Sequence, residues 1–420
     1  MKRYESYKDS GVEWIGEIPS HWMLGKLYQY STLLSGSTPS RGVPEYWEGG
    51  TIKWMSSGEV NKRIIREVEG RITVRGHQES NTPLLPIGTV MIGLNGQGRT
   101  KGTVGLLEVE TTCNQSLCGV ILKQGVLPKY CFYYLDSQYY NLRGMVGEGQ
   151  REGLSVSFLS SYPLILSPLP EQEQIVSFLD EKTSKIDDLI KKKEQKIELL
   201  KEYRTSLINR VITKGLNPDV HMKDSGVEWI GEIPSHWITS NVRYELDFHD
   251  NKRIPLSSEE REGRQGEYRY YGSTGVIDYV DDYLFDGEYI LIGEDGSNLR
   301  LRNYPLSSVV DGKFWVNNHS HILKTKSGVN KYYSHLLEMT DFTTFITGST
   351  QPKLTMDNLK EVALVSPPLP EQEQIVSYLE GKTGEIDSTI DYEKKKIDLL
   401  KEYRQSLISS VITGKIKVVD

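Results

Sequence analysis

An internal duplication constrains this 420-residue chain more than any other feature. The sequence KDSGVEWIGEIPSHW occupies residues 8–22 and returns unchanged at residues 223–237. A second block, LPEQEQIVS, begins at Leu169 and again at Leu369, and each copy continues into a similar stretch rich in lysine and glutamate. The two halves therefore share one order of parts, which is a leading segment, a variable middle and a tail.

Each tail has the pattern of a long helix. Pro170 and Pro370 fix φ in the first turn, and the Glu-Gln-Glu that follows places acidic charge at the positive end of the helix dipole. Apolar residues then recur in alternating steps of three and four, with charged residues at a few positions. This seam consists of Ile186, Ile190, Ile197, Leu200, Leu207 and Val211 in the first copy and of Ile386, Ile390, Ile397, Leu400, Leu407 and Val411 in the second. Two such heptad seams in one chain predict that the tails pack on each other as a coiled coil.

The ends of the predicted helices are also marked. A continuous helix over 170–214 would be roughly 65 Å long at about 1.5 Å per residue, and Gly215 and Gly414 are typical helix-ending residues. Gly381 and Gly384 each cost about 1 kcal/mol relative to alanine, so a local break near the start of the second helix is one expectation.

The two middles, residues 23–165 and 238–365, differ strongly in sequence. Both contain short β-type runs (TVMIGL, SLCGVIL, EYILIG, HILK) and a helical stretch towards the end, which predicts a mixed α/β domain for each. The first middle is longer by 15 residues, because the leading segments repeat after 215 residues and the tails after 200. The echo of GTVMIGLNG in GEYILIGEDG keeps the spacing of 200, which places the extra residues between Trp22 and Val90.

Polar side chains in glycine-rich loops are the candidates for DNA contact. Arg, Asn and Gln match the hydrogen-bonding edges of guanine and adenine, Lys and Arg also neutralise phosphates, and glycine lets the backbone approach a ligand. Any one of them alone is as well explained as an ordinary turn residue, but they cluster in both copies. The candidates are Asn95, Gln97, Arg99, Lys101, Gln115, Gln150 and Arg151 in the first middle, and Asn298, Arg300, Arg302, Asn318, Gln351 and Lys353 in the second.

Charge and composition limit the classes of function. The net charge is −7, with +3 on residues 23–165 and −5 on residues 238–365, so the chain by itself should bind DNA weakly. The absence of an apolar run of 18 residues and of a signal-peptide pattern leads us to expect a cytoplasmic protein without a membrane segment. We expect Cys113, Cys118 and Cys131 to be reduced thiols that bind no metal.

Catalytic motifs do not emerge from the sequence. GQGRTKGT resembles a phosphate-binding loop but lacks the order of the Walker motif, and neither GxSxG nor HExxH occurs. Glu294, Asp295 and Asp311 could form a nuclease centre, although surface acids are the commoner explanation. We therefore expect no catalytic residues and no metal site in this chain.

The combination of two LPEQEQIVS blocks that open long helices with two divergent middles, each entered through GVEWIGEIPSHW, closely resembles the specificity subunits of type I restriction-modification systems. The resemblance covers almost the whole chain. It implies an α+β fold with two target recognition domains separated by two long helices that form an antiparallel coiled coil, related by a pseudo-two-fold internal repeat. It also implies that each domain reads one half of a split sequence in double-stranded DNA.

The resemblance further implies partners and cofactors. DNA-methyltransferase subunits, usually two, would dock on the repeated regions and carry S-adenosylmethionine, and a separate restriction and translocase subunit would use ATP and Mg. The chain itself would hold no cofactor. The implied division is 1–22, leading segment; 23–165, first recognition domain; 166–215, first helix; 216–237, linker and leading segment; 238–365, second recognition domain; 366–420, second helix.

Two alternatives remain open at this point. One is a two-lobed, coiled-coil adaptor that binds proteins and has no DNA specificity. The other is an enzyme with a hydrolytic site hidden in one of the middles.

Overall fold

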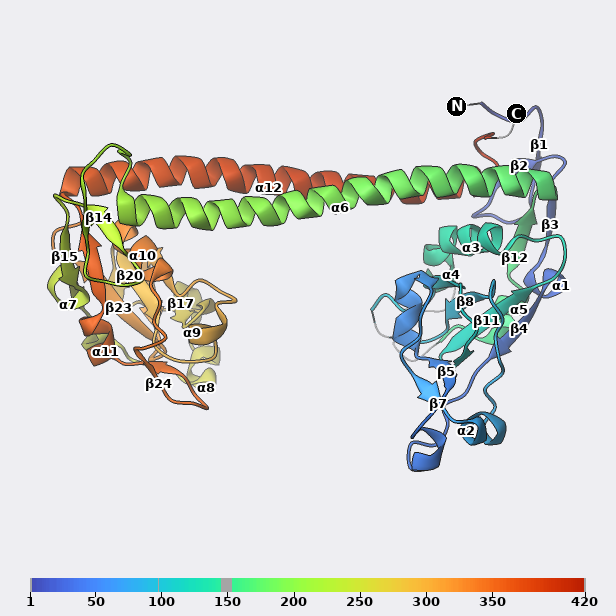
Figure 1. The fold of residues 1–420 in the computed structure, drawn as a ribbon, viewed down its shortest axis with the longest axis horizontal. Coiled ribbons are helices and arrows are strands. Elements are labelled where there is room, and N and C mark those ends of the chain that lie inside the picture. The colour runs from blue at the N-terminus through green and yellow to red at the C-terminus, as the bar shows by residue number, and fades with distance from the viewer. Residues whose placement is uncertain (1, 97, 145–152, 419–420) are drawn as a thin grey trace. The chain divides into compact units, whose positions relative to one another are not determined.

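The computed structural model describes residues 2–96, 98–144 and 153–418, which form two compact units (Figure 1). The first unit is Met1–Lys193 with Lys395–Asp420, and the second is Glu194–Lys394. Their division falls within the two long helices, α6 (Leu169–Lys214) and α12 (Leu369–Ile412), so each unit contains one part of each helix. The two predicted long helices are thereby confirmed.

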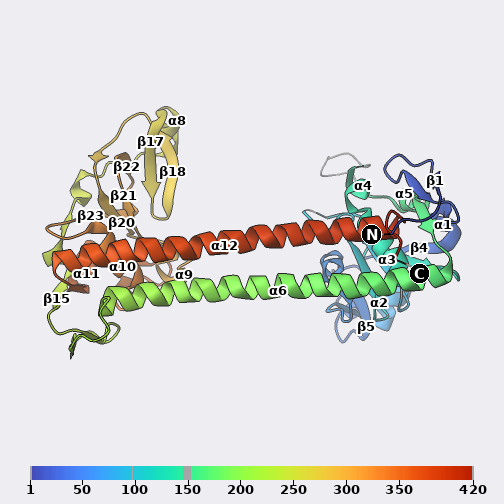
Figure 2. The same cartoon turned by 90° about the horizontal axis from the view of Figure 1, so that it is seen from above.

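The helices pair antiparallel within each unit (Figure 2). In the second unit Lys196 binds Glu393 (2.6 Å) and Arg204 binds Asp387 (3.1 Å), so the partner's number falls as that of α6 rises. In the first unit Arg404 binds Asp187 (2.9 Å). Arg204, Glu393 and Arg404 occupy charged positions in the same heptad stripe as the apolar seam, and such polar residues fix the register of a coiled coil more than they stabilise it.

The apolar seam residues lie where the heptad pattern predicts them. Leu200 and Leu400 are half-buried, and the other ten members of the seam are buried. The break considered at Gly381 and Gly384 does not occur, since α12 is continuous. The two glycines cost about 2 kcal/mol together, whereas burying Ile386 and Ile390 contributes about 1.5–3 kcal/mol for each side chain.

The repeated leading segments close each unit around the start of its own helix. The buried indole of Trp22 donates to Glu171 (2.7 Å), and that of Trp237 donates to Glu371 (3.0 Å). The end of the other helix lies against the same segment. A Cβ on Gly414 would meet Pro19 at 2.4 Å. The contact between the leading segment and the start of a long helix therefore occurs in both units and needs the same residues in each, which explains why the two segments are identical.

The LPEQEQ blocks connect helix and domain. The buried Gln172 accepts from the backbone N–H of Leu127 (2.9 Å), and Gln372 accepts from that of Val329 (2.9 Å). Because these bonds tie the first helical turn to the domain before it, the sequence of the turn is constrained in both copies.

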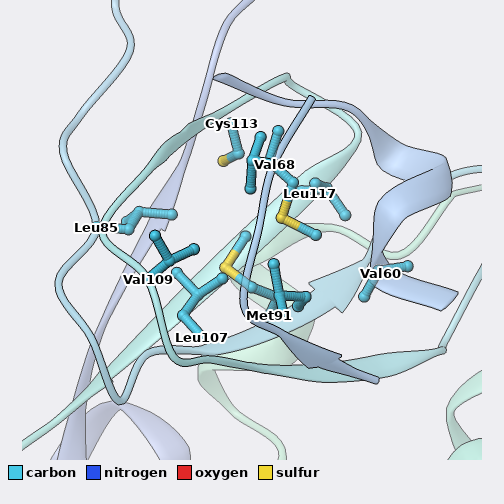
Figure 3. Close-up of a cluster of buried hydrophobic side chains, with 10 residues drawn as sticks. Val60, Val68, Leu85, Met91, Leu107, Val109, Cys113 and Leu117 are labelled. Carbon is cyan, nitrogen blue, oxygen red and sulfur yellow. The ribbon is translucent and has the colours of Figure 1, made fainter. Parts of the chain in front are cut away.

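A five-stranded sheet forms the centre of the first unit, in the order β4-β11-β8-β9-β6. Its core contains Met55, Met91, Leu107, Cys113 and Leu117, which belong to β5, β8, β9, β10 and β11. Figure 3 shows side chains of this cluster, among them Met91, Leu107, Cys113 and Leu117. The strands of the unit are β1 (Tyr7–Asp9), β2 (Glu17–Pro19), β3 (Met23–Lys26), β4 (Ser31–Ser35), β5 (Ile52–Met55), β6 (Ile64–Ile65), β7 (Arg71–Ile72), β8 (Val90–Gly93), β9 (Val104–Leu107), β10 (Thr112–Cys113), β11 (Leu117–Leu122) and β12 (Pro163–Leu166). Its short helices are α1 (Leu27–Tyr30), η1 (Pro44–Tyr46), η2 (Ser57–Lys62), α2 (Val74–Glu79), α3 (Pro128–Ser137), α4 (Tyr139–Gly144) and α5 (Val156–Ser160).

Two four-stranded sheets form the second unit, in the orders β16-β23-β20-β21 and β18-β17-β22-β19. Its strands are β13 (Met222–Asp224), β14 (Glu232–Pro234), β15 (Ile238–Asn241), β16 (Leu246–Phe248), β17 (Gln265–Gly272), β18 (Gly275–Val280), β19 (Phe285–Asp286), β20 (Tyr289–Gly293), β21 (Ser307–Val310), β22 (Lys313–Val316), β23 (Ser320–Thr325), β24 (Ile346–Thr347), β25 (Lys353–Leu354) and β26 (Ala363–Ser366). Its short helices are α7 (Val242–Glu245), η3 (Asp250–Lys252), α8 (Ser258–Glu262), α9 (Asn298–Leu301), α10 (Asn330–Met339) and α11 (Met356–Glu361).

The internal repeat persists in the middles, although their sequences differ. The order β4-β11-β8-β9 corresponds to β16-β23-β20-β21, and α3 and α5 correspond to α10 and α11. The two units differ between β4 and β8 and between the corresponding strands β16 and β20. In this interval the first unit has η1, β5, η2, β6, β7 and α2, and the second has η3, α8 and β17–β19. The extra residues therefore lie in the predicted region before Val90.

Candidate nucleic-acid interface

Three loops meet at one end of the central sheet in each unit. In the first unit the N–H of Leu94 donates to the carbonyl of Ser116 (2.8 Å), and the N–H of Leu154 donates to that of Leu94 (2.9 Å). In the second unit the N–H of Glu294 donates to the carbonyl of His319 (2.9 Å), and the N–H of Leu354 donates to that of Glu294 (2.8 Å). The same backbone bonds thus join the loops after β8 and β20, before β11 and β23, and before α5 and α11. We call each junction the three-loop surface.

The first three-loop surface collects several predicted contact residues. Asn95 and Gln115 follow or flank the bonded backbone groups, and both are exposed; Gln115 accepts from the hydroxyl of Thr38 (2.6 Å). Arg99 is exposed and Lys101 is half-buried in the same loop. Gln97, Gln150 and Arg151 lie outside the described residues.

Arg143 shapes this surface and was not among the predicted residues. Its guanidinium donates to the carbonyls of Gly98 and Lys101 (both 2.9 Å) and lies over the ring of Tyr139 (5.4 Å). It therefore holds the loop that carries Arg99. No sequence signal marked Arg143, because its partners lie more than 40 residues earlier in the chain.

The second three-loop surface collects four of the six predicted residues of the second middle. Arg300, Asn318, Gln351 and Lys353 are exposed. The ammonium of Lys353 contacts Glu294 (3.1 Å), and Arg300 donates to the carbonyl of Gly348 (3.0 Å). Residues that are widely spaced in the sequence therefore present their polar groups on one surface.

Two predicted residues of the second middle have internal roles. Asn298 is buried, its amide donates to the carbonyl of Tyr304 (3.0 Å), and its side-chain oxygen accepts from the N–H of Tyr304 (2.9 Å). Arg302 donates to the carbonyls of Glu338 (2.9 Å) and Thr340 (2.5 Å). The amide of Asn298 is therefore directed into the domain, and the guanidinium of Arg302 joins its own loop to the end of α10. The backbone of Arg302 has a φ of +52°.

A buried charge network supports the second surface. Arg253 contacts Glu294 (2.6 Å) and Asp250 (3.4 Å), and His321 contacts Asp250 (2.6 Å). Burial alone would raise the pKa of Asp250, but its hydrogen bond to His321 and the neighbouring charges bring that pKa below its ordinary value. The pKa of Glu294 is lowered in the same way, since burial is outweighed by Arg253, His321 and Lys353. Both carboxylates are therefore charged and paired at neutral pH.

Asp250, Glu294 and His321 are the one group of potential metal ligands among the described residues, with ligand atoms within 4.8 Å of one another. Arg253 and Lys353 already supply positive charge to these carboxylates. These two side chains would repel a metal cation, so the group is better explained as a structural ion-pair network. The predicted cysteines are also structural: all three are free, and burial raises the pKa of each thiol to about 12.

The negative charge of the second middle is concentrated in one segment of its sequence. Residues 258–286, which contain α8, β17 and β18, hold eight acidic and three basic side chains, and this difference equals the −5 of the whole middle. Arg261 binds Asp278 (2.9 Å) and Arg264 binds Asp281 (2.9 Å). The remainder of the middle is neutral, so the acidic total does not oppose a DNA contact by the three-loop surface.

Comparison with known proteins decides the family. The model of the type I restriction modification DNA specificity domain matches residues 19–199 and 245–402. The chain belongs to the type I restriction-modification specificity family. Within the described residues, none of the helices combines the length and apolar character needed to span a membrane.

Individual members of the specificity family are similar to this chain over different lengths. The type I restriction enzyme MjaIX specificity subunit of Methanocaldococcus jannaschii is 23% identical over 96% of this chain and 95% of its own length. A putative specificity subunit of Haemophilus influenzae, S.HindORF215P, is 38% identical over 136 residues, and the alignment spans 34% of that relative.

Two solved structures share the fold. A chain of the type I R-M system superposes with a TM-score of 0.72 at 14% identity and covers 95% of this chain and 99% of its own. The HsdS subunit of Thermoanaerobacter tengcongensis gives a TM-score of 0.53 at 15% identity over 95% of this chain and 98% of its own.

Proposed function

We propose that this chain is the non-catalytic DNA-recognition subunit of a type I restriction-modification complex, with residues 23–165 and 238–365 each reading one half of an asymmetric, bipartite target. The observation that carries the proposal is the three-loop surface, which has the same backbone hydrogen bonds in both units but unlike side chains. A common scaffold suits a common task, and different side chains select different base edges.

The remaining residues join and space the two readers in this proposal. Residues 1–22 and 216–237 hold the leading segments, and 166–215 and 366–420 hold the paired helices. A continuous helix is a stiff spacer, so the length of α6 and α12 would set the number of unread base pairs between the half-sites.

The methyltransferase subunits would dock on the paired helices. Leu199 and Tyr203 of the second unit are 64% and 57% exposed, and their repeat counterparts Leu399 and Tyr403 of the first unit are 62% and 50% exposed. We call each pair an exposed Leu-Tyr pair. Side chains four residues apart lie on one helix face, and an apolar pair that is kept in both copies suits two identical partners.

A hydrogen bond between α12 and the recognition domain of the first unit indicates which face of this helix is available to a partner. Gln405 donates to the carbonyl of Asp136 in the recognition domain (3.1 Å). At about 100° per residue, Tyr403 lies about 200° from Gln405 around α12. The exposed Leu-Tyr pair of the first unit therefore faces away from the domain of that unit.

S-adenosylmethionine, ATP and Mg would be bound by the partner subunits.

Mapping methylated adenines genome-wide, with and without this gene, would test the proposal. We expect a discontinuous motif that disappears with the gene. Replacing residues 238–365 with another recognition domain should change one half of the motif and leave the other half intact. Retention of methyltransferase subunits without any sequence-dependent binding of DNA would instead identify an adaptor, and cleavage of DNA by the isolated chain with Mg²⁺ would identify an enzyme.

A further inference from the structure

His319 lies on the second three-loop surface, and a carboxylate fixes the orientation of its ring. Nδ1 lies 2.8 and 2.9 Å from the two side-chain oxygens of Asp295. The side chain of His319 is 46% exposed, whereas that of Asp295 is 16% exposed. A carboxylate accepts hydrogen bonds, so Nδ1 carries a proton, and Nε2 has no hydrogen-bond partner within the described part of the chain.

His321, two residues later, shows what a structural histidine in this domain looks like. Its side chain is 1% exposed, and both ring nitrogens are used, with Nδ1 on Asp250 (2.6 Å) and Nε2 on the carbonyl of Leu354 (2.8 Å). Packing therefore accounts for His321 completely. It accounts for only one nitrogen of His319.

The internal repeat identifies the same place in the first unit. The carbonyl of His319 accepts from Glu294, as that of Ser116 accepts from Leu94, so His319 and Asp295 correspond to Ser116 and Asn95. The backbone is repeated here but the side chains are not. This is the property that a position must have if two similar domains read different half-sites.

We propose that His319, oriented by Asp295, is a specificity-determining residue of the second half-site and accepts at Nε2 a hydrogen bond from an exocyclic amino group. The proposal rests on the function proposed above. An imidazole that carries a single proton, held at Nδ1 by Asp295, has a lone pair at Nε2 that can accept a hydrogen bond. The donors that bases offer in the major groove are the amino groups at N6 of adenine and N4 of cytosine.

Base analogues provide the test, using the full chain assembled with its methyltransferase subunits. Each adenine of the second half-site is replaced in turn by 2′-deoxynebularine, which lacks the N6 amino group, and each cytosine by 2′-deoxyzebularine, which lacks the N4 amino group. At one position the analogue should weaken binding by the wild-type complex about 3–10-fold, the value of one hydrogen bond. In His319→Ala the same analogue should have no further effect.

Matched variants distinguish reading from folding. Binding to the first half-site, measured with the same His319→Ala complex, should keep its full base preference, and Ser116→Ala should leave the second half-site unchanged. The inference is overturned if every adenine and cytosine analogue acts on His319→Ala as it does on the wild type. It is also overturned if the lost preference maps to a guanine, since the ring would then be a donor. A wild-type complex without base preference in either half-site would refute the proposed function itself.

Discussion

The exposed Leu-Tyr pairs give a prediction that uses the duplication as its own control. We expect the double variant Leu199→Ala, Tyr203→Ala to weaken the binding of one methyltransferase subunit and leave the other unchanged. The corresponding double variant at Leu399 and Tyr403 should do the same for the other subunit. Because α6 and α12 each contribute one pair to a different unit, the effects on the two subunits should be independent.

The magnitude follows from the exposed fractions. Burying a Leu or aromatic side chain completely contributes about 1.5–3 kcal/mol. Leu199 and Tyr203 are already 36–43% covered in the free chain, being 64% and 57% exposed, so a partner that covers the rest gains about 1–2 kcal/mol from each. The pair therefore contributes about 2–4 kcal/mol, which corresponds to a loss of affinity of roughly 30- to 700-fold.

Native mass spectrometry of titrated complexes counts the methyltransferase subunits bound to each chain. The wild type should carry two, each double variant should carry one at intermediate concentrations, and the combined variant should carry none. Glu198→Ala with Glu202→Ala, on the same turns of α6, is the matched control and should retain two. The reasoning would be wrong if either double variant bound both subunits with the wild-type affinity.

Three further predictions concern the helix ends, the buried charges and the spacing. Gly414→Ala should lower the free energy of local opening at the leading segment more than Gly215→Ala does, as measured by hydrogen exchange, because both residues have positive φ (+74° and +73°) but only the Cβ at 414 would lie as close as 2.4 Å to another residue. The folded pKa values of Asp250 and Glu294 are lowered, so the two carboxylates should stabilise the fold fully above their unfolded pKa values of about 4 and lose this effect as the pH falls through the folded values. Urea unfolding at a series of pH values should show the loss of stability, and the double variant Asp250→Asn, Glu294→Gln should make that loss smaller. Adding one heptad to each long helix, about 10.5 Å, should add about three base pairs to the gap in the methylation motif.

Each of these outcomes has a clear opposite. Equal exchange rates in the two glycine variants would show that the close contact at residue 414 has no energetic weight. An acid transition that the double amide variant leaves unchanged would locate the titrating groups elsewhere. An unchanged gap after heptad insertion would mean that the helices do not determine the spacing.

The helices could be predicted from the sequence because their signals are local. Proline and acidic residues at the start, a heptad seam and a glycine at the end are all read within a few residues of each other. The expectation about the helices that failed, a break at Gly381 and Gly384, concerned a balance between local cost and burial. Helix propensity includes only the cost of the two glycines. The structure shows that Ile386 and Ile390 are buried in the seam, and the free energy of that burial exceeds the cost.

The loops were harder to interpret because hydrogen-bond partners there are distant in sequence. Asn298 and Arg302 have the residue types expected of base contacts, yet Tyr304 and the end of α10 occupy their polar groups. The reverse holds for His319, which stood beside the selected Asn318 and gained its significance only from Asp295, 24 residues away. Residue type in a loop gives a side chain its chemistry but does not tell which groups remain available.

The sequence alone determined that the chain is a duplicated protein with two long helices and two unlike middles, since a repeat and a heptad period are written in the order of residues. The tertiary structure decided how those parts are used. It showed that the identical segments close each unit around a helix start and which loop side chains stay exposed. It also showed that each of the unlike middles has its own sheet and its own three-loop surface, built in the same strand order and with the same backbone hydrogen bonds. Those properties depend on contacts between residues far apart in the chain, which local pattern cannot specify.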